Sequence, residues 1–195
     1  MVNGAGRVAN VDGLGKVRSE RRRIALDAYL RSTSNPAVYV CGDAVAETAQ
    51  LSSIATYEGR IFGRNIVDGA KHTPDYASIP ACVLTPVLAS VGLTQADAEE
   101  KGREFRVAVN DMRGWLSSGT YAERAAWTKV LIDKRTDRVI GTHVVRHADE
   151  ELIHITALVI KHGITAGDLG DLVYGFPTFT ADIESMLYAR LSTVG

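Results

Sequence analysis

The sequence predicts an α+β fold in which an antiparallel sheet is flanked by helices. Two features predict it. From residue 79 onward, stretches typical of strands are separated by short turn-forming segments, as in an antiparallel meander. Between and after them, apolar residues recur at helical spacing behind Thr and Asp residues that can cap helices.

The strands are expected to follow one another with only one short helix between the first two. An apolar stretch is interrupted by Thr85-Pro86, which predicts a strand with a break. Phe105, Val107 and Val109 alternate with polar residues, which predicts a half-buried strand. The expected strands cover 83–93, 105–109, 127–132 and 139–145, with a turn at 134–137.

The helices are predicted from periodicity and end signals. Ser52 or Ser53 is expected to cap a helix that ends near Asp68-Gly69, with Leu51, Ile54, Ala55, Ile61, Phe62 and Ile66 at helical spacing. Further helices are expected from Thr94 to Gly102, from Asp149 to Gly163, from Thr165 and Asp168 onward, and over a last segment with Ile183, Met186, Leu187 and Leu191 on one face.

A strand followed by a helix is predicted before the meander. The apolar run 37–40 ends at Gly42-Asp43, which indicates a buried strand entering a tight turn. A carboxylate at that position can accept hydrogen bonds from sugar or ribityl hydroxyls. The N-terminus of the next helix presents free N–H groups to an electron-rich ring edge. A Gly-Asp pair also often forms only a turn, so from these residues alone both interpretations, a turn and a site for such a ligand, stay open.

Composition excludes several classes of function. The formal net charge is −1 and the hydrophobic content is 46%, so no bulk field attracts nucleic acid or an anionic membrane. The short basic run of Arg21, Arg22 and Arg23 is interpreted as a solvated face. No apolar stretch is long enough for a membrane helix, and no secretory signal core is present. A cytoplasmic location is expected.

Metal and hydrolase chemistry have little support in the sequence. Cys41 and Cys82 are far apart and match no metal or redox spacing. The five histidines form no cluster of the kind that binds a metal, so no metal is expected. The glycine pairs Gly4/Gly6 and Gly13/Gly15 lack the strand–helix context of a phosphate loop. No Gly-x-Ser-x-Gly nucleophile motif occurs.

Several segments, taken in order, resemble one enzyme family. Asn35 to Asp43 (NPAVYVCGD), followed by Leu51 to Arg60 (LSSIATYEGR), resembles the second flavin-binding segment of the glutathione reductase and dihydrolipoamide dehydrogenase family. The resemblance continues through 4–10, 79–86, 89–94, 141–145 and 150–163. The chain is thus similar to the C-terminal part of the pyridine nucleotide–disulfide oxidoreductases over nearly its whole length.

The resemblance implies an organisation and a cofactor. It implies the end of a nicotinamide-binding domain at 1–35, the last segment of a flavin-binding α/β domain at 36–78, and the family's dimerisation domain at 79–195. It further implies FAD, NAD(P)H used through a domain that is absent here, and a homodimer. The residues that it implies for flavin binding are Gly42, Asp43, Leu51, Ser52 and Ser53.

The sequence departs from the family pattern in ways that bear on catalysis. The Gly-x-Gly-x-x-Gly motif and the Cys-x4-Cys redox pair are absent, so the chain alone is expected to be inactive and not to retain FAD. Phe176 and Ala181 replace the family's proton-relay histidine and its glutamate, which leaves Tyr174 and Asp182 as weak candidates. The resemblance also predicts a cis bond between Phe176 and Pro177.

Two hypotheses of function follow. The first is a C-terminal fragment of an FAD-dependent oxidoreductase that acts on a disulfide or a related small-molecule acceptor. The second is a stand-alone, non-catalytic dimerisation or interaction module descended from such an enzyme. The Phe-Pro pair is similar to that of mercuric reductases, but the paired C-terminal cysteines of that group are absent, so the substrate stays open.

Overall fold

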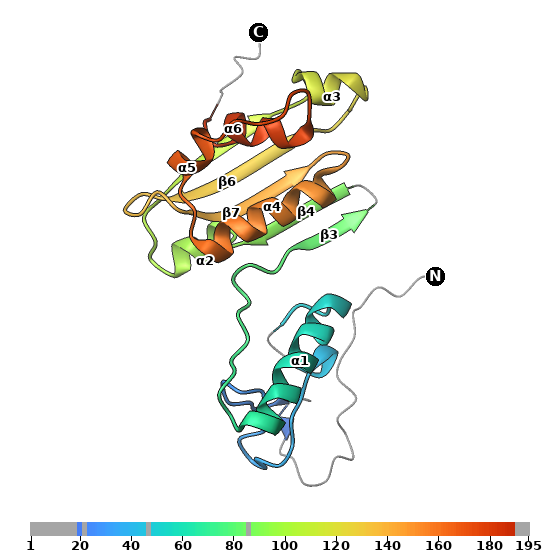
Figure 1. Ribbon diagram of the computed structural model, residues 1–195, viewed down its shortest axis with the longest axis vertical. Coiled ribbons are helices and arrows are strands. Elements are labelled where there is room, and N and C mark those ends of the chain that lie inside the picture. The colour runs from blue at the N-terminus through green and yellow to red at the C-terminus, as the bar shows by residue number, and fades with distance from the viewer. Residues whose placement is uncertain (1–18, 21–22, 46–47, 85–86, 190–195) are drawn as a thin grey trace. The chain divides into compact units, whose positions relative to one another are not determined.

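In the computed structural model, the chain is described over residues 19–20, 23–45, 48–84 and 87–189. It divides into two compact units, Met1–Asp75 and Tyr76–Gly195 (Figure 1). The first unit contains β1 (Ser19–Glu20), β2 (Arg23–Ile24), the 3₁₀ turn η1 (Gly42–Ala44) and α1 (Ser52–Asp68). Within this unit, the segments before and after residue 35 pack together, since the Ser32 N–H donates to Val38 O at 2.8 Å.

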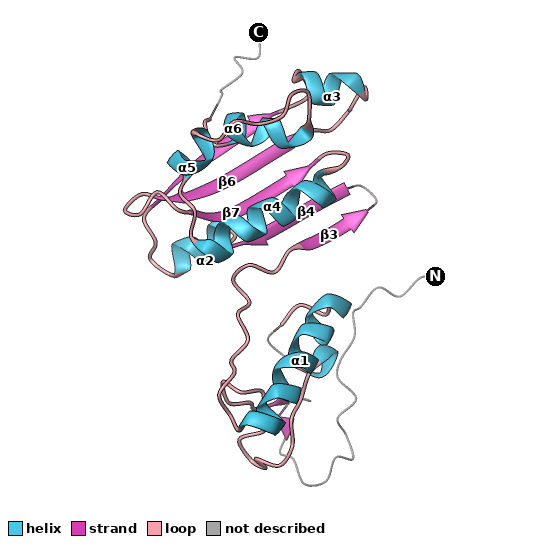
Figure 2. Ribbon diagram, viewed as in Figure 1, coloured by secondary structure: helices cyan, strands magenta, loops and turns pink. Residues whose placement is uncertain are grey.

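The second unit is built on one antiparallel sheet with the strand order β3-β4-β7-β6-β5 (Figure 2). Its elements are β3 (Ala81–Leu84), β4 (Val87–Gly92), α2 (Gln95–Glu100), β5 (Phe105–Asp111), α3 (Leu116–Thr120), β6 (Trp127–Asp133), β7 (Val139–Val145), α4 (Asp149–His162), α5 (Ala166–Gly170), η2 (Phe179–Ala181) and α6 (Asp182–Met186). The predicted α+β class, with an antiparallel sheet and flanking helices, is confirmed. The predicted break at Thr85-Pro86 lies outside the described residues.

The core of this unit lies between the sheet and the helices on one of its faces. Helix α4 packs on β4 and β7, whereas α6 packs on β5 and β6. Ala89, Val91, Val130, Val144 and Ile153 are all at most 3% exposed in this layer. Burial of this apolar surface is the main force that holds the unit together.

The other face of the sheet, called the outer face below, keeps apolar side chains in solvent. Val83 lies opposite Leu88 in the β3–β4 pair. Val109 of β5 lies opposite Lys129 of β6, and Trp127 lies on the same side of β6, two residues before Lys129. The four apolar side chains, Val83, Leu88, Val109 and Trp127, are 44–56% exposed. The half-buried strand predicted from Phe105, Val107 and Val109 is present as β5, but its buried positions are Ala108 and Asn110, on the side opposite to Val109.

Local signals set the helix ends of the second unit. Thr94 and Thr165 each form a capping box, with Asp97 and Asp168 respectively, as predicted. Helix α4 ends at His162 and is capped by Gly163, which has φ 65° and so occupies the left-handed region that glycine tolerates. The last helix is shorter than predicted: α6 ends at Met186, and Leu191 lies outside the described residues.

Three expectations for the first unit need correction. The helix begins at Ser52 as expected, but Leu51 is the N-cap and no side chain caps the helix. Segment 37–40 forms only an isolated bridge between Tyr39 and Arg31, because no neighbouring strand among the described residues offers it a continuous ladder. Ile66 is 61% exposed, since the buried stripe runs through Ile54, Glu58, Ile61 and Asn65.

Candidate functional site

The first candidate site is the turn that carries Gly42 and Asp43. Gly42 has φ +69°, which favours glycine. A Cβ at Gly42 would lie 3.1 Å from the Cβ of Ala55, so the turn lies close against the first turns of α1. Asp43 follows in η1 and is exposed. The turn thus presents the Asp43 carboxyl beside the start of a long helix.

The start of α1 supplies the other predicted residues of this site. Leu51 is half-buried, whereas Ser52 and Ser53 are exposed in the first turn. No side chain caps the helix and no acidic residue lies in its first turn. The positive end of the helix dipole is therefore not neutralised by a carboxylate of that turn. This arrangement suits an electron-rich or anionic group.

The second candidate site surrounds the cis-proline loop, defined here as residues 175–181. The predicted cis bond between Phe176 and Pro177 is confirmed. Phe176 is 76% exposed beside a cavity of about 570 Å³. The cavity lies among α3, the first half of α4 and this loop, and its apolar lining is Leu116, Tyr121, Ala148, Leu152, Ile155, Phe176, Pro177 and Phe179. We call this surface the pocket face.

A buried cation holds the pocket face together. The guanidinium of Arg146, which is 1% exposed, donates to Asp149 Oδ1 at 2.8 Å and to Asp182 Oδ2 at 2.5 Å. It also donates to Ser117 Oγ at 3.0 Å and lies 4.7 Å above the ring of Phe179. One side chain therefore joins α3, α4, η2 and α6.

Asp149 is the electrostatically perturbed member of this network. Burial raises the pKa of its carboxyl to about 6, against the opposing effect of Arg146. Its Oδ2 atom has no hydrogen-bond partner among the described residues. Asp149 is fully buried, so it is a structural acid of the network, with no route to a ligand in the cavity.

The two weak catalytic candidates are both engaged in structure. Tyr174 Oη donates to the carbonyl oxygen of Leu169 at 2.9 Å, and burial raises the pKa of this phenol. Asp182 accepts from Arg146 and from Ser117 Oγ, the latter at 2.5 Å. Ala181, at the position where the resemblance implies the family's glutamate, ends η2. These contacts favour roles in holding the loop.

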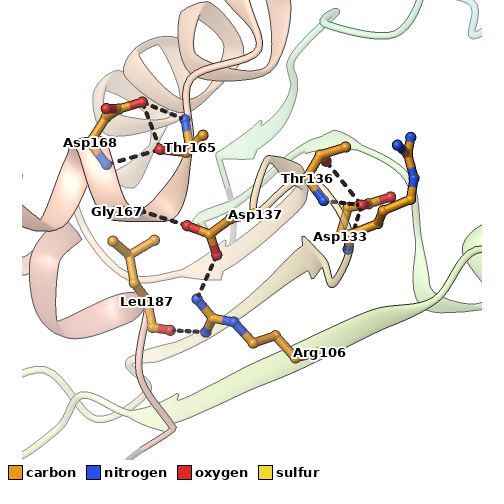
Figure 3. Close-up of polar contacts among 9 residues, drawn as sticks. Arg106, Asp133, Thr136, Asp137, Thr165, Gly167, Asp168 and Leu187 are labelled. Atoms are coloured by element: carbon orange, nitrogen blue, oxygen red, sulfur yellow. Dashed lines mark hydrogen bonds and ion pairs between the residues drawn. The ribbon is translucent and has the colours of Figure 1, made fainter.

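A second polar cluster fixes the C-terminal helices to the sheet (Figure 3). Arg106 of β5 donates to Leu187 O at 2.8 Å and lies 3.5 Å from Asp137 Oδ1. Asp137 Oδ2 in turn accepts from the backbone N–H of Gly167 at 2.9 Å. The cluster thus connects β5 and the β6–β7 turn to α5, through Gly167, and to the end of α6, through Leu187. The cis-proline loop lies between α5 and α6 in the sequence.

The sequence predicts neither a metal site nor a membrane-spanning helix, and the described residues bear on both expectations. Among them, no group of three or more His, Cys, Asp or Glu side chains is placed to hold a metal ion. No helix within the described part of the chain has the length and apolar character needed to cross a membrane.

Several residues of these sites are absent from the sequence-based prediction. Glu58 is fully buried and accepts from Gly42 N–H, yet a glutamate inside a helix is usually exposed. A signal existed, because the spacing 54-58-61-65 places Glu58 on the apolar stripe. Arg146 had no comparable signal, since its partners Ser117 and Asp182 are 29 and 36 residues away.

Comparison with known proteins identifies the class to which this fold belongs. The family model for the pyridine nucleotide-disulphide oxidoreductase dimerisation domain matches residues 79–187. An uncharacterized 19.7 kDa protein in a mercuric resistance operon of Staphylococcus aureus is 32% identical over 89% of this chain and 97% of its own length. The chain therefore belongs to the pyridine nucleotide–disulphide oxidoreductase family.

Larger relatives and a solved structure add to this. Mercuric reductase of Bacillus cereus is 30% identical over 90% of this chain, which covers only 28% of that enzyme. The structure of LpdA from Mycobacterium tuberculosis shares the fold, with a TM-score of 0.80 and 23% identity over 92% of this chain and 40% of LpdA. The chain thus spans about a third of the larger relatives and nearly all of a short one.

Proposed function

We propose that this chain supplies the homodimer interface and part of the flavin site of a cytoplasmic FAD-dependent, NAD(P)H-using oxidoreductase. Its acceptor is a disulfide or a related small molecule. The observation that carries the proposal is the match of residues 79–187 to the family's dimerisation domain. In this proposal residues 1–35 are the end of a nicotinamide-binding domain, residues 36–78 are the last segment of the flavin-binding domain, and residues 79–195 are the dimerisation domain. No nucleic acid or membrane takes part.

The pocket face is the proposed dimer surface. Leu116, Tyr121, Leu158 and Phe176 are 56–76% exposed on or next to it, which is a large apolar exposure for a monomer. Along α4, Glu151, Ile155, Leu158 and His162 follow one stripe at helical spacing. Two copies of α4 packed antiparallel about a two-fold axis would place the acidic first turn of one against Lys161 and His162 of the other.

The Gly42–Asp43 turn and the start of α1 support the flavin part of the proposal. Asp43 offers a carboxyl for ribityl hydroxyls, and Ser52 and Ser53 offer backbone N–H groups at an uncapped helix start. The Leu51 N–H donates to Ala49 O at 2.9 Å, so Leu51 would contact the flavin through its side chain. These donors and acceptors fit the polar groups of a flavin. When bound, FAD supplies electron transfer between the nicotinamide and the acceptor.

The Staphylococcus aureus relative favours the second candidate function, a stand-alone dimerisation module without catalysis. That relative has nearly the same extent as this chain and is named from a mercuric resistance operon. Phe176 and Ala181, at the family's histidine and glutamate positions, agree with a non-catalytic role, because neither side chain transfers protons.

The size of the native product separates the two candidates. An antibody raised against this chain would be used to blot the source cells. A band more than twice the 21.0 kDa of this chain supports the oxidoreductase fragment, whereas a band at 21.0 kDa supports the module. In both cases the purified chain is expected to sediment as a dimer, and a monomer at every concentration would overturn the proposed interface.

A further inference from the structure

Glu58 occupies a position in α1 that an apolar residue would normally fill. It lies on the buried stripe with Ile54, Ile61 and Asn65, and it is 0% exposed. Burial of a carboxylate is costly unless hydrogen bonds compensate it. A buried acid at the centre of a helix therefore calls for a specific partner.

One such partner is the turn of the first candidate site. The backbone N–H of Gly42 donates to Glu58 Oε2 at 2.6 Å, across 16 residues of sequence. This is a short, charge-assisted bond of the stronger class. Gly42 also lies close to Ala55 of α1, so the same turn is in contact with the helix at a second point. Glu58 and Ala55 are on adjacent turns of the helix, so two contacts hold Gly42 in place.

We propose that Glu58 is the positioning residue for Asp43 at the flavin hydroxyls. Glu58 is buried and accepts from the turn, whereas Asp43, the residue after Gly42, is exposed. Without the Glu58 acceptor, the Gly42 N–H is no longer held in place. The backbone of the turn can then move, and the direction in which the Asp43 side chain points is no longer fixed. The inference rests on the proposed flavin role of this turn and goes beyond it by naming the residue that orients it.

Asn65 provides a matched control in the same helix. It is 1% exposed, and its side chain bonds to Tyr29 O, Lys71 N, His72 N and His72 O. Asn65 is therefore a buried polar anchor of α1, like Glu58, but it holds the end of the helix and leaves the Gly42 turn untouched.

Amide hydrogen exchange on the full chain tests the anchoring step. In Glu58→Ala, exchange at Gly42 is expected to accelerate roughly tenfold or more, while Glu58→Gln, which keeps an oxygen acceptor, stays within about threefold of the parent. Asn65→Ala is expected to accelerate Lys71 and His72 and to leave Gly42 unchanged. Unchanged exchange at Gly42 in Glu58→Ala would overturn the inference.

Cys41 reports on Glu58 without any cofactor. Burial and then the nearby Glu58 charge raise the pKa of the Cys41 thiol. Glu58→Gln is therefore expected to speed alkylation of Cys41 by iodoacetamide by roughly twofold or more. Cys82, in the other unit, is the internal reference and is expected to react at its parental rate. An unchanged Cys41 rate contradicts the placement of the Glu58 carboxylate beside the turn.

Titration with FAD then separates this inference from the proposed function. FAD at about 1 mM is expected to shift the Asp43 amide in NMR spectra of the parent chain, as weak binding allows. The shift is expected to disappear in Glu58→Ala, to return in Glu58→Gln and to persist in Asn65→Ala. A parent without the shift overturns the flavin role itself. A parental shift that persists in Glu58→Ala overturns only the positioning role of Glu58.

Discussion

At the scale of residues, the second unit depends on one buried cation with two carboxylates. Arg146 is paired with Asp149 and Asp182, and neither Arg146 nor Asp149 is exposed. A buried pair of this kind stabilises little in total, but removal of one partner leaves a buried charge. The network therefore specifies where α3, α4 and α6 meet more than it adds to stability.

Asp149 makes stability depend on pH in an unusual direction. Its folded pKa is raised from 3.8 to about 6, so the folded state holds this proton more tightly than the unfolded state. The contribution of Asp149 to the free energy of unfolding is therefore fully present below pH 4 and is lost as pH rises to about 6. The loss is expected to reach at most about 3 kcal/mol.

Asp149→Asn removes this titration and keeps an oxygen acceptor for Arg146. Urea unfolding between pH 4 and 7, followed by the fluorescence of Trp115 and Trp127, reports on this unit because both tryptophans lie in it. The variant is expected to show a smaller fall in stability across that range than the parent. The exposed Asp171→Asn is the control. A parental slope in Asp149→Asn would contradict the assignment of the raised pKa.

Prediction from sequence at this scale succeeded where one residue carries its own local signal. The cis bond before Pro177 was predicted because the bond type belongs to proline and the family resemblance located it. Glu58 and Arg146 were not predicted, because a charged side chain is buried only when distant partners meet it, and those partners come from tertiary packing.

At the scale of elements, turns and caps hold the C-terminal helices against the sheet. Thr165 caps α5, and the same segment is bonded to the β6–β7 turn through Gly167 and Asp137. The helix is only five residues long, so its stability comes from these contacts.

Thr165→Ala removes the cap hydroxyl. The variant is expected to lower the free energy of unfolding by about 1 kcal/mol, because a backbone N–H of the first turn loses its acceptor. Thr165→Ser restores a hydroxyl and is expected to recover most of the loss. Urea unfolding followed by tryptophan fluorescence measures both, and equal stability of Thr165→Ala and the parent would show that the cap contributes nothing.

Arg106→Met tests the connection of β5 to the end of α6. It removes the 2.8 Å bond to Leu187 O but keeps most of the aliphatic length. A loss of about 1 kcal/mol is expected, the usual size for one hydrogen bond. Arg103→Met is the matched control, since Arg103 is 52% exposed and 3.7 Å from Asp133. A loss as large in Arg103→Met would mean that the effect is not specific to Arg106.

The element-scale predictions from sequence were the most complete. The alternation and the caps predicted β6, β7, α2 and α4 within a residue or two, because those signals are local. Segment 37–40 was predicted as a strand and forms only one bridge, between Tyr39 and Arg31, since a strand needs a longer ladder with its neighbour than this segment makes.

At the scale of the molecule, two apolar surfaces compete for the role of interface. The pocket face carries Phe176, with Leu158 next to it on the exposed stripe of α4, and the outer face carries Val109 and Trp127. The charges along α4 favour the pocket face, because its acidic start and basic end are complementary to a second antiparallel copy. The sequence predicted a dimerisation domain through the family resemblance. It did not indicate which surface forms the interface, because that depends on which apolar side chains are exposed and on the strand register.

The most direct test is sedimentation equilibrium of the chain beside Leu158→Glu and Val109→Glu. The two parent side chains are 56% and 45% exposed, so each variant places one charge on one apolar surface. The account predicts twice 21.0 kDa for the parent and for Val109→Glu, and a monomer for Leu158→Glu. A monomeric parent at all concentrations, or a dimer that only Val109→Glu disrupts, would contradict it.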